Sequence, residues 1–499
     1  MTTTLPCATE PAAYAAPGPT TDGPTTDGPA DPDAPSLPSL QARFRPVFDR
    51  IAQGAAERER TRSLAHEPIA WLRDSGFTAL RVPRRLGGAG ASVEQLFALW
   101  TELAEADSNV AQILRPHFGF LDRVLIDRDA ATQARWLPLA ARGAVFGNAT
   151  TEVGAGTLGT LQTTLVPDAQ PGWWRLDGRK FYSTGTLYAD WVTVVARAVE
   201  PGKEDQTVHA VVPTSESGVQ RFDDWRGFGQ RLTGSGTTVL SQVRVPDDAV
   251  IRFPRAQPTP LVAYFQLAHL ATLAGIARAL QRDAIAYVQA RRRVFSHGSA
   301  TLPKDDPLVQ HIVGQLAGTA YIAGLAVADV AAELGRIARE REAGREVPLQ
   351  QLHALELRTA QAQVAVVDTV LQAAARLFEV GGSSALSEDL ALDRHWRNAR
   401  TLASHNPVLY KARSAGDILL NGADPIYYWH VGVTGHGGLK ALARPRCAGT
   451  GAAAVPISPE RISTCHAPQN PLQKQALAKA PKPISKCVKF LSPYRRSAL

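Results

Sequence analysis

Residues 147–156 read Gly-Asn-Ala-Thr-Thr-Glu-Val-Gly-Ala-Gly, and the pattern of the chain changes at this stretch. Before it, apolar residues recur every three or four positions, as in Phe44, Phe48 and Ile51, which is typical of amphipathic helices. After it, apolar and polar residues alternate through several short segments, which is typical of strands. The sequence therefore predicts a helical region followed by a β domain.

Composition and periodicity divide the chain into five regions. Residues 1–38 are rich in Pro, Thr, Ala, Asp and Gly, so they bury too little apolar surface to order themselves and are predicted to form a disordered leader. Changes of pattern set the other boundaries: an N-terminal helical domain at 39–145, a β domain at 146–256, a helical bundle at 257–425 and a basic, low-order tail at 426–499.

The bundle is predicted from four long segments with helical periodicity. They span 261–293, 307–343, 348–380 and 390–420, and long helices with short connections are typical of an antiparallel bundle. In the β domain, alternating segments predict strands at 161–166, 173–176, 179–183, 191–196, 208–212 and 239–245. Asp177-Gly178, between two of these segments, predicts a hairpin turn.

The net charge of the chain is +8, but it is unevenly distributed. Residues 431–499 contain six Lys, five Arg and one Glu, which is +10, so the remainder carries about −2 (8 − 10). The main body therefore lacks the basic signature of a nucleic-acid-binding protein.

Several classes of protein are disfavoured by simple sequence features. No apolar run reaches the length of a membrane span, so we expect no membrane role. The four cysteines, at positions 7, 447, 465 and 487, lie in the leader and the tail, so the core needs no disulfide and no thiolate metal site. A cytoplasmic location fits these features, and we expect no metal in the core.

Three motifs in combination resemble the acyl-CoA dehydrogenase fold. Residues 151–156 are similar to the family's TEPGAG-type loop against the flavin ring, and 180–185 lie where the family has a strand end on the other side of the ring. Residues 378–382 resemble the glycine pair of the bundle that reaches a neighbouring subunit's flavin. The resemblance covers about residues 40–425 and implies an α+β fold: N-terminal helical domain, middle β-barrel domain, C-terminal four-helix bundle and a homotetramer.

Within that family the chain most resembles the flavin-dependent monooxygenases that include dibenzothiophene monooxygenase and the sulfur-acquisition oxidoreductases. The segments that carry this likeness are 115–120, 181–185, 224–237 and 393–407. Where the dehydrogenases place a glutamate base, residues 404–407 read Ser-His-Asn-Pro, and residues 266–269 also lack a carboxylate. Leu158 replaces the acidic residue that usually ends the TEPGAG-type loop, which argues against an acyl-CoA substrate. Removal of a carbon-bound proton needs a base, so this site suits oxygen transfer better.

The resemblance implies a C4a-hydroperoxyflavin, which must be shielded from water and held at its polar edge. Small polar side chains suit that task. The candidate cofactor-binding residues near the ring are Asn148, Thr150, Thr151, Ser183, Thr184 and Trp225. The candidate catalytic residues are His117, Ser183 and His405, because an imidazole with a pKa near neutrality can hold or donate a proton.

Other candidates have two interpretations open. Arg293, or Arg292 if the register differs, either holds the flavin phosphate or is a solvated helix end. Gly381, Gly382 and Ser383 either offer amides to a phosphate from a second subunit or cap a helix. The candidate substrate-binding residues, some of which could equally belong to the core, are Phe118, Trp225, Phe228 and Asn406.

Residues 154–159 match the dinucleotide pattern G-x-G-x-x-G, but strands rather than a helix are predicted to follow, so we reject a nicotinamide site. A separate flavin reductase is therefore expected to supply reduced flavin. The interpretation as a whole is a two-component monooxygenase that uses reduced FMN and O2 on a small organosulfur substrate. FAD is the alternative to FMN, and only the resemblance favours FMN. The alternatives are an acyl-CoA dehydrogenase-type oxidoreductase and an N-oxygenase of an amine or amino sugar.

Overall fold

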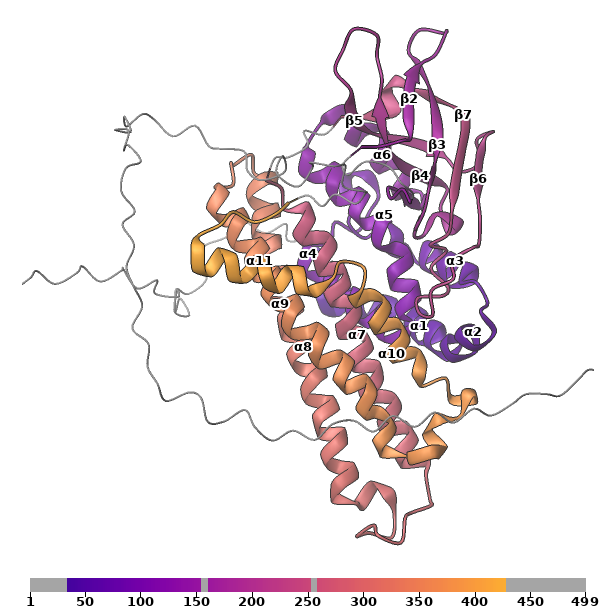
Figure 1. Cartoon of the computed structure of the whole chain (residues 1–499), viewed down its shortest axis with the longest axis vertical. Coiled ribbons are helices and arrows are strands. Elements are labelled where there is room, and N and C mark those ends of the chain that lie inside the picture. Colours follow the sequence, from indigo (N-terminus) through magenta and orange to yellow (C-terminus); the bar gives the residue numbers. More distant parts are fainter. Residues whose placement is uncertain (1–33, 154–159, 253–257, 428–499) are drawn as a thin grey trace, which may run out of the picture. The chain divides into compact units, whose positions relative to one another are not determined.

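The structure, a computed structural model, describes residues 34–153, 160–252 and 258–427. All of these residues lie in the first of two units of the chain, Met1–Gly438. The predictions for most of the leader, the 154–159 motif and nearly all of the tail lie outside the described residues. Within the first unit, a helical region, a sheet and a helical bundle follow one another in the predicted order, so the α+β prediction is confirmed (Figure 1).

The N-terminal region is helical, as predicted, and it begins earlier than expected. Ser36 accepts a hydrogen bond from the backbone amide of Ser39, and Pro38 suits the first helical turn, so the first helix starts at Leu37 inside the predicted leader. The helices of this region are α1 (Leu37–Gln53), α2 (Ala55–Thr61), α3 (His66–Asp74), α4 (Val93–Ala106), α5 (Ser108–Asp127) and α6 (Ala130–Ala141).

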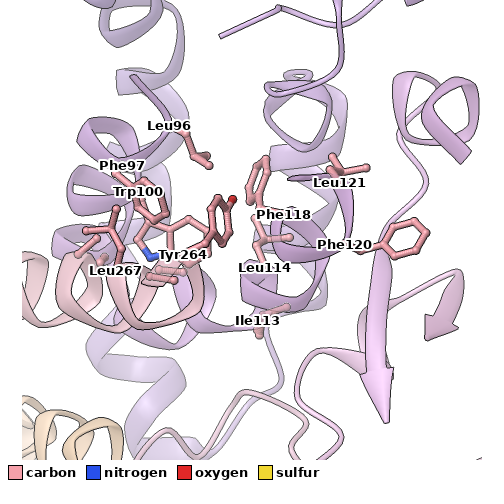
Figure 2. Close-up of a cluster of buried hydrophobic side chains, with 14 of the residues drawn as sticks. Leu96, Phe97, Trp100, Ile113, Leu114, Phe118, Phe120, Leu121, Tyr264 and Leu267 are labelled. Atoms are coloured by element: carbon pink, nitrogen blue, oxygen red, sulfur yellow. The ribbon is translucent and has the colours of Figure 1, made fainter. Parts of the chain in front are cut away.

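Large aromatic side chains join the N-terminal helices to the bundle. Trp100 on α4 and Phe118 on α5 are fully buried and lie 5.8 Å apart between ring centroids. Tyr264, on helix α7 (Leu261–Ala290), lies 5.2 Å from Phe97 of α4. Figure 2 shows these side chains meeting between the three helices. Because an aromatic pair adds about 1 kcal/mol beyond its buried area, this cluster fixes α4, α5 and α7 as one body.

The middle region is a single eight-stranded sheet with the order β6-β7-β3-β2-β4-β5-β8, and β1 pairs with β4 outside that path. In the described residues, no pairing joins β6 to β8, so the predicted barrel is observed as a sheet. The strands are β1 (Phe146–Ala149), β2 (Thr164–Pro167), β3 (Trp173–Lys180), β4 (Trp191–Ala198), β5 (Gln206–Pro213), β6 (Val219–Arg221), β7 (Thr238–Pro246) and β8 (Val250–Ile251).

The predicted hairpin at Asp177-Gly178 is wrong. Strand β3 continues through these residues and pairs with β7 on both sides of a register shift between Leu176 and Gly178. The carboxylate of Asp177 accepts hydrogen bonds from the backbone and side-chain nitrogens of Gln242 on β7. Gly178 has a φ of 157°, and a Cβ there would lie 2.4 Å from the hydroxyl of Thr163. The Asp-Gly pair therefore forms a β-bulge, where close approach requires glycine.

The bundle contains the predicted long helices α7, α8 (Pro307–Glu342) and α9 (Leu349–Arg376), the last followed by a 3-10 turn at Leu377–Val380. The predicted fourth helix over 390–420 is two helices, α10 (Asp393–Ala403) and α11 (Val408–Asn421). The break lies at residues 404–407 because a proline disfavours helical conformation in the residue before it. Pro407 thus turns the chain between α10 and α11 at the motif that carries His405.

Two helices, α7 and α8, are long and apolar enough to cross a membrane by length and composition, which the sequence analysis did not anticipate. In the apolar window of α7, 78% of the residues are buried within the protein, as expected for the core helix of a bundle. In the window of α8 only 22% are buried. Helix α8 therefore presents an apolar face that the described part of this chain does not cover.

Candidate active site

The loops that follow β1 and β3 hold the predicted flavin-contacting side chains. The two loops are joined by a bridge between Thr151 and Phe181, and Ser183 follows directly. The side-chain oxygens of Asn148 and Ser183 are buried but have no hydrogen-bond partner among the described residues. Thr184 pairs through its hydroxyl with Ser235 at 2.8 Å. Buried polar atoms without partners are costly in a folded protein, so these oxygens fit the polar edge of a bound group.

A buried ion pair fixes the loop after β1. The ammonium group of Lys180 is fully buried and donates to Glu152 at 2.7 Å and to the carbonyl of Thr150 at 3.3 Å. The carboxylate of Glu152 also accepts hydrogen bonds from the backbone amides of Gln162 and Thr163. Burial opposes the charge, but these hydrogen bonds lower the pKa of Glu152 from 4.5 to about 2. Lys180 was not a predicted site residue, although it begins a segment on which the resemblance rests.

The loop at 181–185 bends sharply beside α5. Tyr182 has a φ of 55°, a region that residues other than glycine rarely adopt, and 52% of its surface is exposed. A Cβ placed on Gly185 would lie 2.4 Å from the carbonyl oxygen of Ile113 on α5. The loop therefore rests against the turn of α5 that carries Gln112 and Arg115. Unusual backbone of this kind is often concentrated at functional sites.

The predicted aromatic residues border this region rather than fill the core. Trp225 donates its indole N–H to the carbonyls of Gly229 and Gln230, and its ring meets Tyr182 edge to face at 5.8 Å. Phe228 is 54% exposed and stacks on Trp396 of α10 at 5.9 Å. Trp225 is half-buried and Phe228 is exposed, so neither belongs to the core, and their contact with a substrate stays a prediction.

Helix α10 and the loop carrying Trp225 are fixed together. The backbone amide of Gln230 donates to Asn398 of α10 at 2.5 Å, and the side-chain amide of Gln230 donates to Ser108 at the start of α5 at 3.3 Å. At its other end, α10 is anchored by Asp283 of α7, which accepts from Arg394 at 2.6 Å and pairs with His395 at 2.8 Å. The turn at 404–407 is thus held against α5 and α7 by contacts on both sides.

Three polar side chains meet at that turn. The guanidinium of Arg115 donates to Nε2 of His405 at 3.3 Å, and the rings of His405 and His269 lie 4.5 Å apart. Arg115 is 7% exposed and His269 only 3%, whereas His405 is exposed to solvent. Both ring nitrogens of His269 lack hydrogen-bond partners in the described part of the chain. Sequence reasoning had singled out His405 alone, because the meeting of α5 with α7 and the turn is a long-range contact.

The charges in this cluster are unbalanced. Dense protein surroundings, and then the positive charge of Arg115, lower the pKa of His405. Burial, and then the neighbouring His405 and Arg115, lower the pKa of His269. Both imidazoles are therefore neutral near pH 7. An arginine has only donors, so Nε2 of His405 accepts and its proton lies on Nδ1.

His117 and Phe118 have packing roles, contrary to the prediction. Nε2 of His117 pairs with the carbonyl of Thr78 at 2.7 Å, and its Nδ1 accepts from the backbone amide of Phe146 at 3.3 Å. Burial lowers the pKa of His117 to about 4, and no ring nitrogen is left to exchange a proton. Phe118 has no exposed surface and packs on Trp100 (Figure 2). The helical repeat places residue 117 on the face of α5 opposite residue 115, toward the core.

The predicted phosphate-binding residues gather at the end of α7. Arg291 donates to the carbonyl of Val380 at 3.1 Å, which brings segment 291–295 beside the glycine pair at 381–382. A Cβ on Gly382, whose φ is 56°, would lie 3.2 Å from the ring of Phe295. Arg293 is exposed. This end of the bundle lies away from the sheet (Figure 1), so the prediction that it serves a second subunit's flavin stays open.

The described residues contain no group of three or more His, Cys, Asp or Glu side chains that could hold a metal ion. The candidate contacts for a ligand are instead the unpartnered side-chain oxygens of Asn148 and Ser183 and the cluster of Arg115, His269 and His405. This set fits a flat polar cofactor such as a flavin better than an ion, because metal sites need several anionic or imidazole ligands around one point.

Comparison with known proteins gives the same order of domains. Residues 40–144 match the acyl-CoA dehydrogenase N-terminal domain, 147–243 the middle domain and 267–409 the C-terminal domain. The chain is similar to the Pseudomonas putida protein named "Probable FMNH2-dependent monooxygenase SfnC". The two are 31% identical over 402 residues, which cover 79% of this chain and 97% of that protein.

Two solved structures show the same arrangement. FMN-bound TdsC, a dibenzothiophene monooxygenase from Paenibacillus sp. A11-2, is 27% identical, with a TM-score of 0.72 over 78% of this chain and 98% of that one. MsuC, a methanesulfinate monooxygenase from Pseudomonas fluorescens, is 29% identical, with a TM-score of 0.70 over 78% of this chain and 98% of that one.

Proposed function

Because the chain belongs to the acyl-CoA dehydrogenase family, we propose that it is the oxygenase of a two-component system that uses reduced FMN and O2. The relatives SfnC, TdsC and MsuC, which are named as monooxygenases, support this class. Two of them are named for sulfur compounds, dibenzothiophene and methanesulfinate, so we propose a small organosulfur substrate.

The observation that carries the proposal is the composition of the turn between α10 and α11. The resemblance places residues 404–407 where the dehydrogenases of the family have a glutamate, and the neighbours of His405 in this turn are Arg115 and His269. Both imidazoles are neutral, and a cation lies beside them, so the cluster is a poor base for a carbon-bound proton. This argues against the dehydrogenase alternative.

Reduced FMN, when bound, supplies the electrons that activate O2. The residues of this chain then have three tasks. Asn148 and Ser183 offer otherwise unpartnered oxygens to the polar edge of the ring, and Thr184 stands beside them. Trp225 and Phe228, with Tyr182, border the site and limit the access of water. His405 carries its proton on Nδ1, from which it can donate a hydrogen bond to oxygen, while Arg115 fixes its Nε2.

A separate reductase is part of the proposal. The G-x-G-x-x-G match at 154–159 lies outside the described residues, but the elements that follow it are β2 and β3 rather than a helix, so it lacks the setting of a dinucleotide site. We propose a cytoplasmic setting, which suits a supply of reduced flavin and the absence of cysteines from residues 8–446.

We expect the purified chain with FMN and NADH alone to consume no oxygen above the background of free flavin. Adding a flavin reductase and methanesulfinate should give oxygen consumption and a product that carries one atom from ¹⁸O-labelled O2, measured by mass spectrometry. Steady NADH oxidation without the reductase would contradict the two-component proposal, and unlabelled product would contradict oxygen transfer.

We also propose that copies of the chain associate through α8, and that the assembly is a homotetramer. The exposed face of α8 carries Tyr321, Ile322 and Leu325, which are 67%, 52% and 49% exposed. Along the same face, a Cβ on Gly314 or Gly318 would meet nothing within 4 Å. Apolar patches of this kind are rare on monomers and mark association surfaces. A second copy would also bring Arg293 and Gly381–Ser383 to a neighbouring flavin.

The double variant Ile322→Glu/Leu325→Glu should lower the molar mass measured by light scattering to that of a smaller assembly, because charges are costly in an apolar interface. Val166→Glu, at a 36% exposed position on β2 of the sheet, serves as the matched control and should leave the mass unchanged. If the double variant keeps the mass of the wild-type assembly, association through α8 is wrong.

A further inference from the structure

Among the residues that the structure describes, Arg115 differs from the buried Arg81 and from the half-buried Arg394 and Arg397 in having no carboxylate partner. Arg81 pairs with Asp122 at 2.8 Å, and both side chains are at most 6% exposed. Arg397 pairs with Glu59, and Arg394 with Asp283. The contacts of Arg115 are the ring nitrogen of His405 at 3.3 Å and the face of Phe265 at 5.7 Å. Among the described residues, Arg115 therefore carries a buried charge that no ion pair balances.

Its immediate neighbours cannot supply the missing negative charge. His269 and His405 are neutral or positive, never negative, and their lowered pKa values keep them neutral near pH 7. The Nε atom of Arg115 is buried without a hydrogen-bond partner, and so is Oε1 of Gln112 one turn earlier on α5. Burial of an unpaired charge costs several kcal/mol, so such a group persists where a ligand provides the opposite charge.

The location of Arg115 is the second part of the argument. The loop of Ser183 and Thr184 rests on the same turn of α5, because a Cβ on Gly185 would lie 2.4 Å from the oxygen of Ile113 and 3.2 Å from Pro116. His405 reaches Arg115 from a different element, the turn between α10 and α11. A ligand held by Arg115 would therefore lie near both the loop proposed to contact the flavin and His405.

We propose that Arg115 binds the oxyanion of the substrate, so that this chain acts on small sulfinates rather than on neutral sulfur heterocycles. The inference rests on the proposed function. It selects between an anionic sulfinate and a neutral heterocycle, the two kinds of sulfur compound for which MsuC and TdsC are named. A guanidinium presents a planar fork of donors that matches the paired oxygens of a sulfinate. Phe265, whose ring lies against Arg115, suits the short apolar group of such a molecule.

The reaction balances with the reactants already named. A sulfinate, O2 and reduced FMN give a sulfonate, oxidised FMN and water. One oxygen atom of O2 forms a new S–O bond and the O–O bond breaks. The other oxygen leaves as water with the two protons and two electrons of the reduced flavin, while the substrate keeps its negative charge on Arg115 throughout.

The test measures binding apart from turnover. Methanesulfonate, an unreactive anion with the same charge and methyl group and one more oxygen, is titrated calorimetrically into the FMN-loaded enzyme, with dimethyl sulfone as the neutral probe. We expect Arg115→Gln to weaken methanesulfonate binding about 10- to 100-fold, the range for a lost charge-assisted hydrogen bond, and to leave binding of the neutral probe unchanged. Arg413→Gln, at an exposed position on α11, should bind both as the wild type does.

Three outcomes would overturn the inference. They are equal methanesulfonate affinity in Arg115→Gln and wild type, weaker FMN binding with unchanged methanesulfonate binding, or a wild type that binds dimethyl sulfone more tightly than methanesulfonate.

If Arg115→Gln does not fold, the wild type decides: methanesulfonate, but not dimethyl sulfone, should raise its unfolding temperature. Failure of the proposed oxygenase function can be told apart from failure of the Arg115 inference. If the chain is not an oxygenase, neither methanesulfinate nor a neutral sulfide gives a product that contains oxygen from O2. Product from the sulfide, with no effect of Arg115→Gln, refutes only the sulfinate assignment.

Discussion

His405→Phe should lower substrate-coupled turnover about 100-fold while FMN still binds. The expected size is that of losing one positioned hydrogen-bond donor to the charge that develops during the reaction. The ring of phenylalanine fills the space beside His269 but offers no N–H in place of Nδ1, and it leaves Arg115 without the acceptor at 3.3 Å. Oxygen should still react with reduced flavin, so the yield of hydrogen peroxide per flavin oxidised should rise as the yield of product falls.

The measurement is the ratio of product to reduced FMN consumed, together with the peroxide formed. His353→Phe is a matched control, because His353 lies on α9 beside Tyr427, with ring centroids 6.0 Å apart, and has no contact with His405. Full coupling in His405→Phe would remove His405 from the mechanism. If His353→Phe uncouples product formation from flavin oxidation to the same extent, the assay reports a loss of folding and not the loss of the N–H group of His405.

Glu152→Gln should destabilise the protein by about 3–5 kcal/mol, the cost of leaving one partner of a buried ion pair alone. The ammonium of Lys180 would stay in a site with no exposed surface, facing a neutral amide. Lys180→Met should cost less, because the carboxylate of Glu152 keeps the backbone amides of Gln162 and Thr163. Urea titrations measure the free energy of unfolding of each variant relative to the wild type. The control is Glu57→Gln, which removes one partner of an exposed ion pair with Arg60. It should change the free energy of unfolding by less than about 1 kcal/mol.

The effect of pH on this pair has a defined sign. The folded-state pKa of Glu152 is lowered from 4.5 to about 2, so its stabilising contribution is complete above pH 4.5 and is lost as pH falls toward 2. The difference in stability between the wild type and Glu152→Gln should therefore shrink in that interval. A difference that does not change between pH 5 and pH 2.5, or a larger cost for Lys180→Met than for Glu152→Gln, would contradict this account of the loop.

The order and kind of the domains were predictable from the sequence because they depend on local periodicity. The helical segments and most strands follow from the spacing of apolar residues along the chain, and His405 was singled out by the motif that contains it. Two local errors have clear causes. Asp177-Gly178 has the chemistry of a hairpin turn, but pairing of β3 with β7 on both sides makes it a bulge. The helix expected over 390–420 breaks because Pro407 follows the motif.

The site itself was less predictable, because its residues are brought together by tertiary contacts. His117 and Arg115 are two positions apart on α5, yet one face packs on Thr78 and Phe146 and the other on His405. Periodicity alone did not indicate which face would turn to the core. The buried, unpaired charge of Arg115 becomes visible only when α7 and the turn at 404–407 are placed around it.

Rapid mixing tests the central claim, that this chain is an oxygenase, most directly. The enzyme is loaded with chemically reduced FMN in the absence of oxygen, and then mixed with oxygenated buffer containing methanesulfinate while the flavin spectrum is recorded. The account predicts a flavin absorbance that is neither reduced nor oxidised, which forms first and decays to oxidised FMN as the sulfonate is produced. Direct return to oxidised FMN at the rate of the free flavin, with and without methanesulfinate, would contradict it.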